Sequence, residues 1–199
     1  MVVYPDLMGQ AMLNTVRRNF KSQFSYIQRF IASPRTVGTL APSSPWLCQT
    51  MLNQVEWIPA MTIAELGAAD GVLTRRILSR MEKDARLQAY EIQSHFIDEL
   101  NKIDDPRLQV AARSAELLDL HYDAIFCCLP LLSIPTKISM KILQQTQQRL
   151  RQRNGSLILF QYSHLSEPLL SRYFTWKKMR VVRNFPPALV YICQPREPC

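Results

Sequence analysis

Glycine is scarce in this sequence, with five residues in 199, and the chain has no internal repeat and no low-complexity tract. This composition excludes collagen-like and intrinsically disordered proteins. No apolar run approaches the roughly 18 residues of a membrane-spanning helix, so we expect no such helix. The first ten residues show no basic region followed by an apolar core, and we therefore expect no secretory signal.

The sequence also lacks paired cysteines. The count of five is odd, and no C-x-x-C motif occurs. The three histidines are scattered along the chain, so the sequence predicts no zinc site and no other metal site. We expect reduced thiols that serve as small apolar residues in a reducing cytoplasm.

Acidic residues are in the minority, and the net charge is +8. Residues 1–38 carry five basic side chains against one acidic, and residues 149–199 carry nine against two. Two basic ends on a mildly acidic middle predict an anionic partner, either a lipid surface or a nucleic acid. The alternative is a solvated basic surface that has no partner.

Residues 11–32 are expected to form an amphipathic helix. Phe20, Phe24 and Ile27 belong to an apolar stripe with spacings of three and four, and Arg17 and Lys21 lie beside it. Such a helix suits a membrane interface, although the pattern by itself favours packing against its own domain. We expect two parts, this helix in residues 1–33 and a second domain in residues 34–199.

From residue 45 onward, predicted strands alternate with predicted helices. This alternation indicates an α/β fold with a mostly parallel sheet of seven strands, and the last two strands should form an antiparallel hairpin at one edge. We expect Ser43 or Ser44 to cap the first of these helices and Ser94 to cap the third. The expected helices are 45–55, 71–82, 94–102, 137–151 and 165–175, and the expected strands are 61–66, 87–92, 108–112, 122–128, 156–162, 178–183 and 188–193.

In open α/β sheets, ligands bind beyond the carboxyl ends of the strands. The first strand is followed by a turn of small residues from Gly67 to Gly71, which lets the backbone approach a ligand closely. The second strand is followed by Glu91, an acid placed where it can accept both hydroxyls of a ribose. The turn matches neither G-x-G-x-x-G nor a P-loop. We therefore expect a nucleoside cofactor that is not held through a pyrophosphate group.

Three further motifs are more specific. They are T-V-G-x-x-A-P-S-S at 36–44, L-P-L-L at 129–132 and R-N-x-P-P-A-x-V-Y at 183–191. Together with the turn at 67–71 and Glu91, they make residues 15–195 resemble the bacterial phospholipid N-methyltransferases. These are S-adenosylmethionine (SAM) enzymes of the Rossmann-like class I methyltransferase fold, and they are similar to the rRNA adenine dimethylases.

The resemblance implies a role for each residue that matches the family pattern. Glu65 would lie near the amino group of SAM, Glu91 would hold the ribose, and Cys128 and Leu129 would border the methyl group. Arg183, Asn184 and Tyr191 would bind the lipid substrate, while Tyr26, Tyr162 and His164 are candidates for a catalytic role by position. The remaining cofactor contacts would be Thr36, Gly38, Ser43, Ser44, Gly67, Ala68, Ala69, Gly71, Ile92, Ser114 and Ala115.

The chain departs from the family pattern at two places. Ala69 stands where a glycine is usual, and it fits only if its φ angle is negative. Ser114 stands where an aspartate commonly accepts the adenine amino group, and a serine accepts more weakly. Both departures predict weaker SAM binding or a different activity within the family.

The expected function is SAM-dependent N-methylation of an aminolipid headgroup, with phosphatidylethanolamine as the first choice. An anionic membrane surface is the expected partner, at the inner face of the cytoplasmic membrane. The first alternative is an RNA adenine methyltransferase, but no aromatic residue stands at position 131 to stack on a flipped base. The second is a lipid-binding relative that has lost catalysis through its altered turn.

Overall fold

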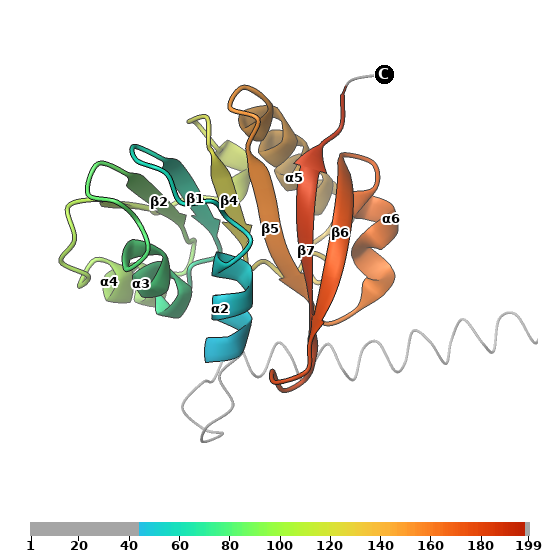
Figure 1. Cartoon of the computed structure of the whole chain (residues 1–199), viewed down its shortest axis with the longest axis horizontal. Coiled ribbons are helices and arrows are strands. Elements are labelled where there is room, and N and C mark those ends of the chain that lie inside the picture. The colour runs from blue at the N-terminus through green and yellow to red at the C-terminus, as the bar shows by residue number, and fades with distance from the viewer. Residues whose placement is uncertain (1–43, 198–199) are drawn as a thin grey trace, which may run out of the picture. The chain divides into compact units, whose positions relative to one another are not determined.

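In a computed structural model, residues 44–197 fold around a single seven-stranded sheet with the strand order β3-β2-β1-β4-β5-β7-β6 (Figure 1). The five strands from β3 to β5 run parallel, and β7 lies antiparallel to both β5 and β6. The strands are β1 (Thr62–Leu66), β2 (Arg86–Tyr90), β3 (Leu108–Ala111), β4 (Ala124–Cys127), β5 (Ser156–Gln161), β6 (Phe174–Val181) and β7 (Ala188–Pro195).

Helices cover both faces of this sheet (Figure 1). Buried side chains of α2 and α3 pack on one face, where α4 also lies, and α5 and α6 belong to the core on the other face. The helices are α2 (Pro45–Leu52), α3 (Val72–Leu78), α4 (Ser94–Leu100), α5 (Thr136–Arg151) and α6 (Glu167–Leu170), with short 3-10 turns η1 (Ala115–Leu117) and η2 (His164–Ser166).

The central strands are buried on both faces, which explains their sequence. All four residues of β4 are buried, as are five of the six residues of β5. A parallel strand between two helical layers has no polar face, so it appears as a continuous apolar run rather than an alternating one. The chain passes from β1 to β2 on one side and later to β4 on the other, which makes the β1/β4 boundary the switch point of the sheet.

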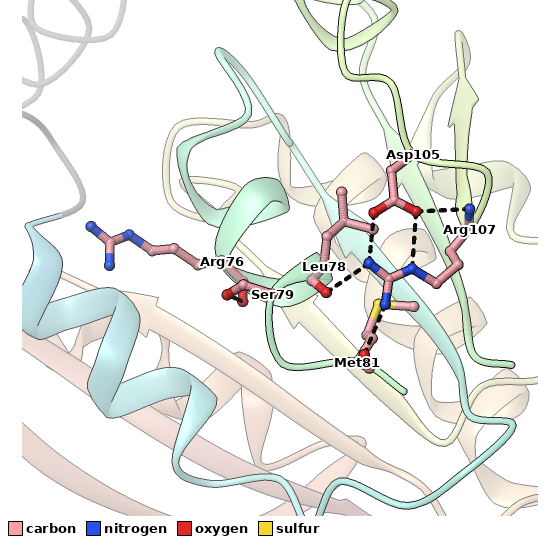
Figure 2. A network of polar contacts seen from close by, with 6 residues as sticks. All are labelled: Arg76, Leu78, Ser79, Met81, Asp105 and Arg107. Carbon is pink, nitrogen blue, oxygen red and sulfur yellow. Dashed lines mark hydrogen bonds and ion pairs between the residues drawn. The ribbon is translucent and has the colours of Figure 1, made fainter. Parts of the chain in front are cut away.

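An arginine that lies far along the chain caps the end of α3. The Arg107 guanidinium donates to the backbone oxygens of Leu78 and Met81, at 3.0 and 2.8 Å (Figure 2). Asp105 holds the same guanidinium through two further hydrogen bonds, of 2.9 and 2.6 Å. The carbonyls at the end of a helix have no partner within the helix, so Arg107 supplies donors that α3 itself lacks.

The predicted fold class, the seven strands and the antiparallel edge hairpin are confirmed. Ser44 is also confirmed as a cap, because its Oγ accepts from the backbone N–H of Leu47. Ser94 is not a cap: it is the first residue of α4, and the capping position belongs to Gln93. The helix expected at 165–175 was wrong in extent, since η2 and α6 end at Leu170 and β6 begins at Phe174.

Within residues 44–197, no helix is both long and apolar enough to cross a membrane. The same part of the chain contains no group of three or more His, Cys, Asp or Glu side chains that could hold a metal ion. The amphipathic helix expected at 11–32 and the domain boundary expected at 33 lie outside the described residues, as do Tyr26, Thr36, Gly38 and Ser43.

Candidate active site at the carboxyl edge of the sheet

The turn after β1 has a left-handed backbone at three positions. The φ angles of Gly67, Ala69 and Gly71 are 77°, 47° and 77°. The turn is fastened to the end of β2, because the N–H groups of Gly67 and Ala68 both donate to the Tyr90 carbonyl, at 2.9 and 3.2 Å. The sequence analysis placed this turn correctly after the first strand, and the structure shows that it lies at the switch point of the sheet.

A side chain at position 67 would require Leu129 to shift, in addition to straining the left-handed φ angle. A Cβ atom at this position would lie 2.7 Å from Leu129 Cδ2, which is closer than such atoms approach in real structures. The turn after β1 and the segment after β4 therefore touch across the switch point. Leu129 and Gly67 were both predicted as cofactor contacts, and the structure brings them together.

Ala69 adopts the conformation that the sequence analysis identified as unfavourable. Its φ of 47° is positive, and an alanine held there costs about 1–2 kcal/mol relative to a right-handed conformation. A hydrogen bond of 3.0 Å from its N–H to Glu91 Oε2 helps to hold this shape. The alanine at position 69 is thus a strained residue within the turn.

Glu91 is nearly buried, at 6% exposure, and it organises the backbone around it. Its Oε2 accepts from Ala69, and its Oε1 accepts from the N–H groups of Ile92 and Gln93 at 2.8 and 2.9 Å. Each carboxylate oxygen has two lone pairs, so Oε2 keeps one acceptor position for a ligand hydroxyl. The next side chain, Ile92, is 71% exposed and offers an apolar surface beside that position.

Glu65 is a buried carboxyl group with an unsatisfied oxygen. Thr74 Oγ1 donates to its Oε2 at 2.6 Å, while Oε1 has no hydrogen-bond partner among the described residues. Burial raises the pKa of Glu65 to about 8, and the nearby Asp70 and Glu91 charges add to that rise while the Thr74 hydrogen bond opposes it. A buried acceptor of this kind is suited to a cationic partner, such as the amino group of an amino acid.

Ser114 follows β3, where an adenine contact was expected. Its Oγ accepts from the N–H of Glu116 at 3.2 Å, which makes Ser114 the cap of η1, and it also donates to Glu116 Oε2. Ala115 beside it is buried. The hydroxyl is therefore engaged locally, and an adenine amino group would have to share it.

Cys128 lies half-buried after β4, with Leu129 next in the chain. Burial raises the pKa of the Cys128 thiol well above its usual value, and the neighbouring Glu65 adds to the shift. The thiol consequently stays neutral at physiological pH and is a poor nucleophile.

A polar cluster that the sequence analysis did not assemble joins three elements at this edge. The Asn184 side chain, which is only 1% exposed, accepts from the Ser44 N–H at 3.0 Å and donates to the Pro186 carbonyl at 2.7 Å. Its hydrogen bond with Tyr162 partly offsets the effect of burial, which raises the pKa of that phenol to about 12. Asn184 therefore connects the start of α2, the end of β5 and the β6–β7 connection, and no local sequence pattern predicts such a link.

The two catalytic candidates within the described residues differ in placement. Tyr162 is half-buried and packs edge-to-face on Phe160, and its raised pKa keeps it protonated at neutral pH. His164 is exposed at the start of η2, near Glu167, whose pKa is lowered chiefly by a hydrogen bond from Lys178. A proton acceptor at neutral pH is therefore not supplied by Tyr162, which can only donate or share its hydroxyl.

The three predicted substrate residues lie in different surroundings. Asn184 is buried in the polar cluster, and Arg183 is exposed with its guanidinium 6.0 Å from the centre of the Trp46 ring. Tyr191 is completely buried on the face of the sheet that carries α5 and α6, and its hydroxyl bonds to Glu167 Oε1 at 2.9 Å. A direct lipid contact by Tyr191 conflicts with this burial, because its side chain already belongs to the core.

These features together fit SAM. The unsatisfied Glu65 oxygen suits the amino group, the remaining acceptor of Glu91 suits a ribose hydroxyl, and the exposed Ile92 suits an adenine face. Between them runs a turn of small residues that has a left-handed backbone at three positions. The donor and acceptor chemistry of the site thus matches the cofactor that the sequence led us to expect.

The sheet order and the site define the class of fold: this is a Rossmann-like class I methyltransferase fold. NodS, an N-methyltransferase from Bradyrhizobium japonicum WM9 solved with S-adenosylhomocysteine, superposes with a TM-score of 0.66 over 87% of this chain and 98% of that one, at 12% identity. Magnesium protoporphyrin IX methyltransferase from Synechocystis PCC 6803, solved with bound SAM, gives a TM-score of 0.63 over 92% and 96% of the two chains, at 16% identity.

A relative by sequence is more specific. The chain is 25% identical over 187 residues to the ornithine lipid N-methyltransferase of Singulisphaera acidiphila, and the match covers 87% of this chain and 96% of the relative. No protein-family model matches the chain.

Proposed function

We propose that this protein is a SAM-dependent N-methyltransferase that acts on the amine of a lipid headgroup. The observation that carries the proposal is the similarity to a lipid N-methyltransferase along nearly the whole of both chains. SAM as the cofactor is supported by that relative, by the cofactor-bound structural neighbours and by the chemistry of Glu65 and Glu91.

Phosphatidylethanolamine is the substrate that we propose first. Its headgroup ends in a primary amine, and so does the head of an ornithine lipid, the substrate named for the sequence relative. One fold can therefore serve either lipid if the acyl chains remain in the bilayer and only the amine reaches the site. The inner face of the cytoplasmic membrane is the location we propose, since the net charge of +8 favours an anionic surface.

The residues of the chain have modest chemistry to perform, because the sulfonium methyl group of SAM is already activated. Glu65, at the end of β1, would ionise to hold a positive amino group, and Glu91 would fix a ribose hydroxyl. Cys128 and Leu129 provide an uncharged wall, which disfavours the charged form of an entering amine. The site would thus act by orienting the amine and desolvating it.

The RNA alternative is disfavoured by the segment after β4. Leu131 is 2% exposed and belongs to the core on the α5 face, so it offers no surface to a flipped base. Position 131 is therefore unsuitable for stacking on a base, because it is buried and because its residue is a leucine.

A competition between acceptors tests the proposal. The full chain is incubated with SAM labelled in its methyl group, together with phosphatidylethanolamine vesicles, ornithine lipid vesicles and RNA in one reaction. We expect label in a lipid fraction and none in RNA. Label in RNA alone would overturn the proposal, and label in neither, with SAM bound, would point to an acceptor outside both classes.

A further inference from the structure

Three of the exposed apolar side chains lie where the β6–β7 connection meets the start of α2. Trp46, Val182 and Phe185 are 52%, 67% and 63% exposed, and we refer to these three residues as the apolar tip. Val182 and Phe185 lie on the connection between β6 and β7, and Trp46 is in the first turn of α2. In Figure 1 that connection projects below the sheet, at the edge where α2 lies.

The connection that carries Val182 and Phe185 is hydrogen-bonded to the start of α2. Asn184, between Val182 and Phe185, is buried and bonded to the Ser44 backbone, so the connection is fixed to the start of α2. Arg183 lies on the same connection, and its guanidinium is 6.0 Å from the centre of the Trp46 ring in α2. Asn184 is thus buried and anchored to α2, while Val182 and Phe185 on either side of it are exposed to solvent.

The hairpin that carries the tip is uniformly basic. From Phe174 to Pro195 it contains Lys177, Lys178, Arg180 and Arg183 and no acidic residue, and all four basic side chains are exposed. One of them, Lys178, pairs with Glu167 at 2.6 Å. Apolar side chains flanked by cations are the combination that suits the interface of an anionic bilayer, where the cations lie among the phosphates.

We propose that the apolar tip docks this protein on an anionic lipid bilayer. Trp46, Val182 and Phe185 enter the interfacial layer, and the basic hairpin meets the anionic headgroups. This deepens the proposed function and rests on it, since Asn184 joins the tip to Tyr162 at the carboxyl edge of β5. A headgroup amine would then have only a short distance to travel from the bilayer to the site.

Other partners fit these residues less well. Nucleic acid would neutralise Arg180 and Arg183 but would leave the exposed surface of Val182 in water. A second copy of the chain, meeting tip to tip, would bring two basic hairpins together and incur like-charge repulsion. An anionic bilayer satisfies the apolar and the basic groups at the same time.

The test measures partition onto vesicles of phosphatidylethanolamine and phosphatidylglycerol, with the full chain and by sedimentation. The double variant Val182→Ser/Phe185→Ser removes the two most exposed apolar side chains of the tip. Its matched control is Ile58→Ser/Leu120→Ser, because these residues are 50% and 40% exposed and precede β1 and β4 at the opposite edge of the sheet. We expect the tip variant to lose about tenfold or more in partition coefficient, and the control to stay within about twofold.

Each outcome bears on the proposal. Equal partition by both variants, or no partition by the unmodified chain, would overturn it. A tip variant that changes the sedimentation of the free protein and leaves vesicle binding unchanged would show that a second copy of the chain occupies the tip. A loss of RNA binding in the tip variant that is as large as its loss of vesicle partition would assign the tip to nucleic acid.

Failure of docking can be told apart from failure of the proposed function. On phosphatidylethanolamine dispersed in detergent, the tip variant should transfer methyl groups within about twofold of the unmodified rate, because no bilayer has to be bound. If the unmodified chain transfers no methyl group to any lipid, the proposed function fails, while the vesicle partition still decides whether the tip docks.

Discussion

Glu65 is the most perturbed carboxyl group near the proposed cofactor site. Its pKa is raised to about 8 mainly by burial, and one of its oxygens has no partner among the described residues. Because the folded pKa exceeds the unfolded one, this group contributes its full stability only below the unfolded pKa. That contribution is lost as the pH rises toward 8.

Replacing Glu65 by Gln should remove this pH dependence. We expect Glu65→Gln to unfold with a larger free energy than the unmodified protein at pH 8, by several kcal/mol, and to differ much less at pH 5. Urea denaturation at the two pH values measures the difference. Equal stability of the two proteins at pH 8 would mean that Glu65 is already ionised in the folded chain.

The same substitution tests the role of Glu65 toward SAM. A carboxyl group that is protonated in the free protein must release its proton when it pairs with an amino group. Calorimetry at pH 7 in two buffers of different ionisation enthalpy should show proton release on SAM binding by the unmodified chain. Glu65→Gln should bind more weakly and release fewer protons, and unchanged release would place Glu65 away from the ligand.

Ala69 can be compared with a second alanine in the same conformation. Ala60 has a φ of 58° and lies between α2 and β1, away from the site. Changing either residue to Gly relieves left-handed strain, so each variant should gain about 0.5–1 kcal/mol in unfolding free energy. Only Ala69→Gly should also tighten SAM binding, and equal affinities in the two variants would show that the alanine is no defect in the site.

At the scale of elements, the strands and the antiparallel hairpin at one edge could be predicted, because buried parallel strands are continuous apolar runs between turns and the last two strands have no helix between them. The boundary between α6 and β6 could not be predicted from the sequence. Phe174 and Trp176 fit helical spacing with the preceding leucines. In the structure they lie two positions apart on one face of a strand, and both contribute to the same core. Pairing with β7 along eight positions decided the outcome, and such pairing is not encoded locally.

The candidate site, like the secondary structure, could be predicted from the sequence only in part. The turn at 67–71 and Glu91 follow strands, so sequence order alone places them together at one edge. Asn184 and Tyr191 come from the hairpin, where the face a side chain occupies depends on register. One residue of register separates a buried position from an accessible one, which is why the role expected for Tyr191 conflicts with the structure.

The link between Arg107 and α3 gives a prediction at the element scale. Changing Arg107 to Ala removes the donors that satisfy the Leu78 and Met81 carbonyls, so we expect a loss of about 1–3 kcal/mol in unfolding free energy. Lys102→Ala is the matched control, because its pair with Glu99 is exposed and contributes little. Equal losses in the two variants, measured by chemical denaturation, would show that the cap is dispensable.

The whole molecule combines a cofactor-type site with a basic surface. The carboxyl edge of the sheet carries the turn and both glutamates, and the hairpin beside it carries cations and the apolar tip. A methyltransferase that acts on a soluble amine has no need of the second feature. The second feature agrees with the proposal, carried by the sequence relative, that the substrate resides in a bilayer.

The central claim is methyl transfer from SAM to a lipid amine, and one measurement tests it most directly. The full chain is incubated with SAM and vesicles of phosphatidylethanolamine and phosphatidylglycerol, and the extracted lipids are analysed by mass spectrometry. A Gly67→Val variant, which clashes with Leu129 and strains the turn, serves as the inactive control. We predict methylated phosphatidylethanolamine from the unmodified chain and none from the variant. An unmethylated headgroup under conditions where SAM is bound would contradict phosphatidylethanolamine as the substrate, and the absence of methylation on ornithine lipid as well would contradict the lipid methyltransferase assignment itself.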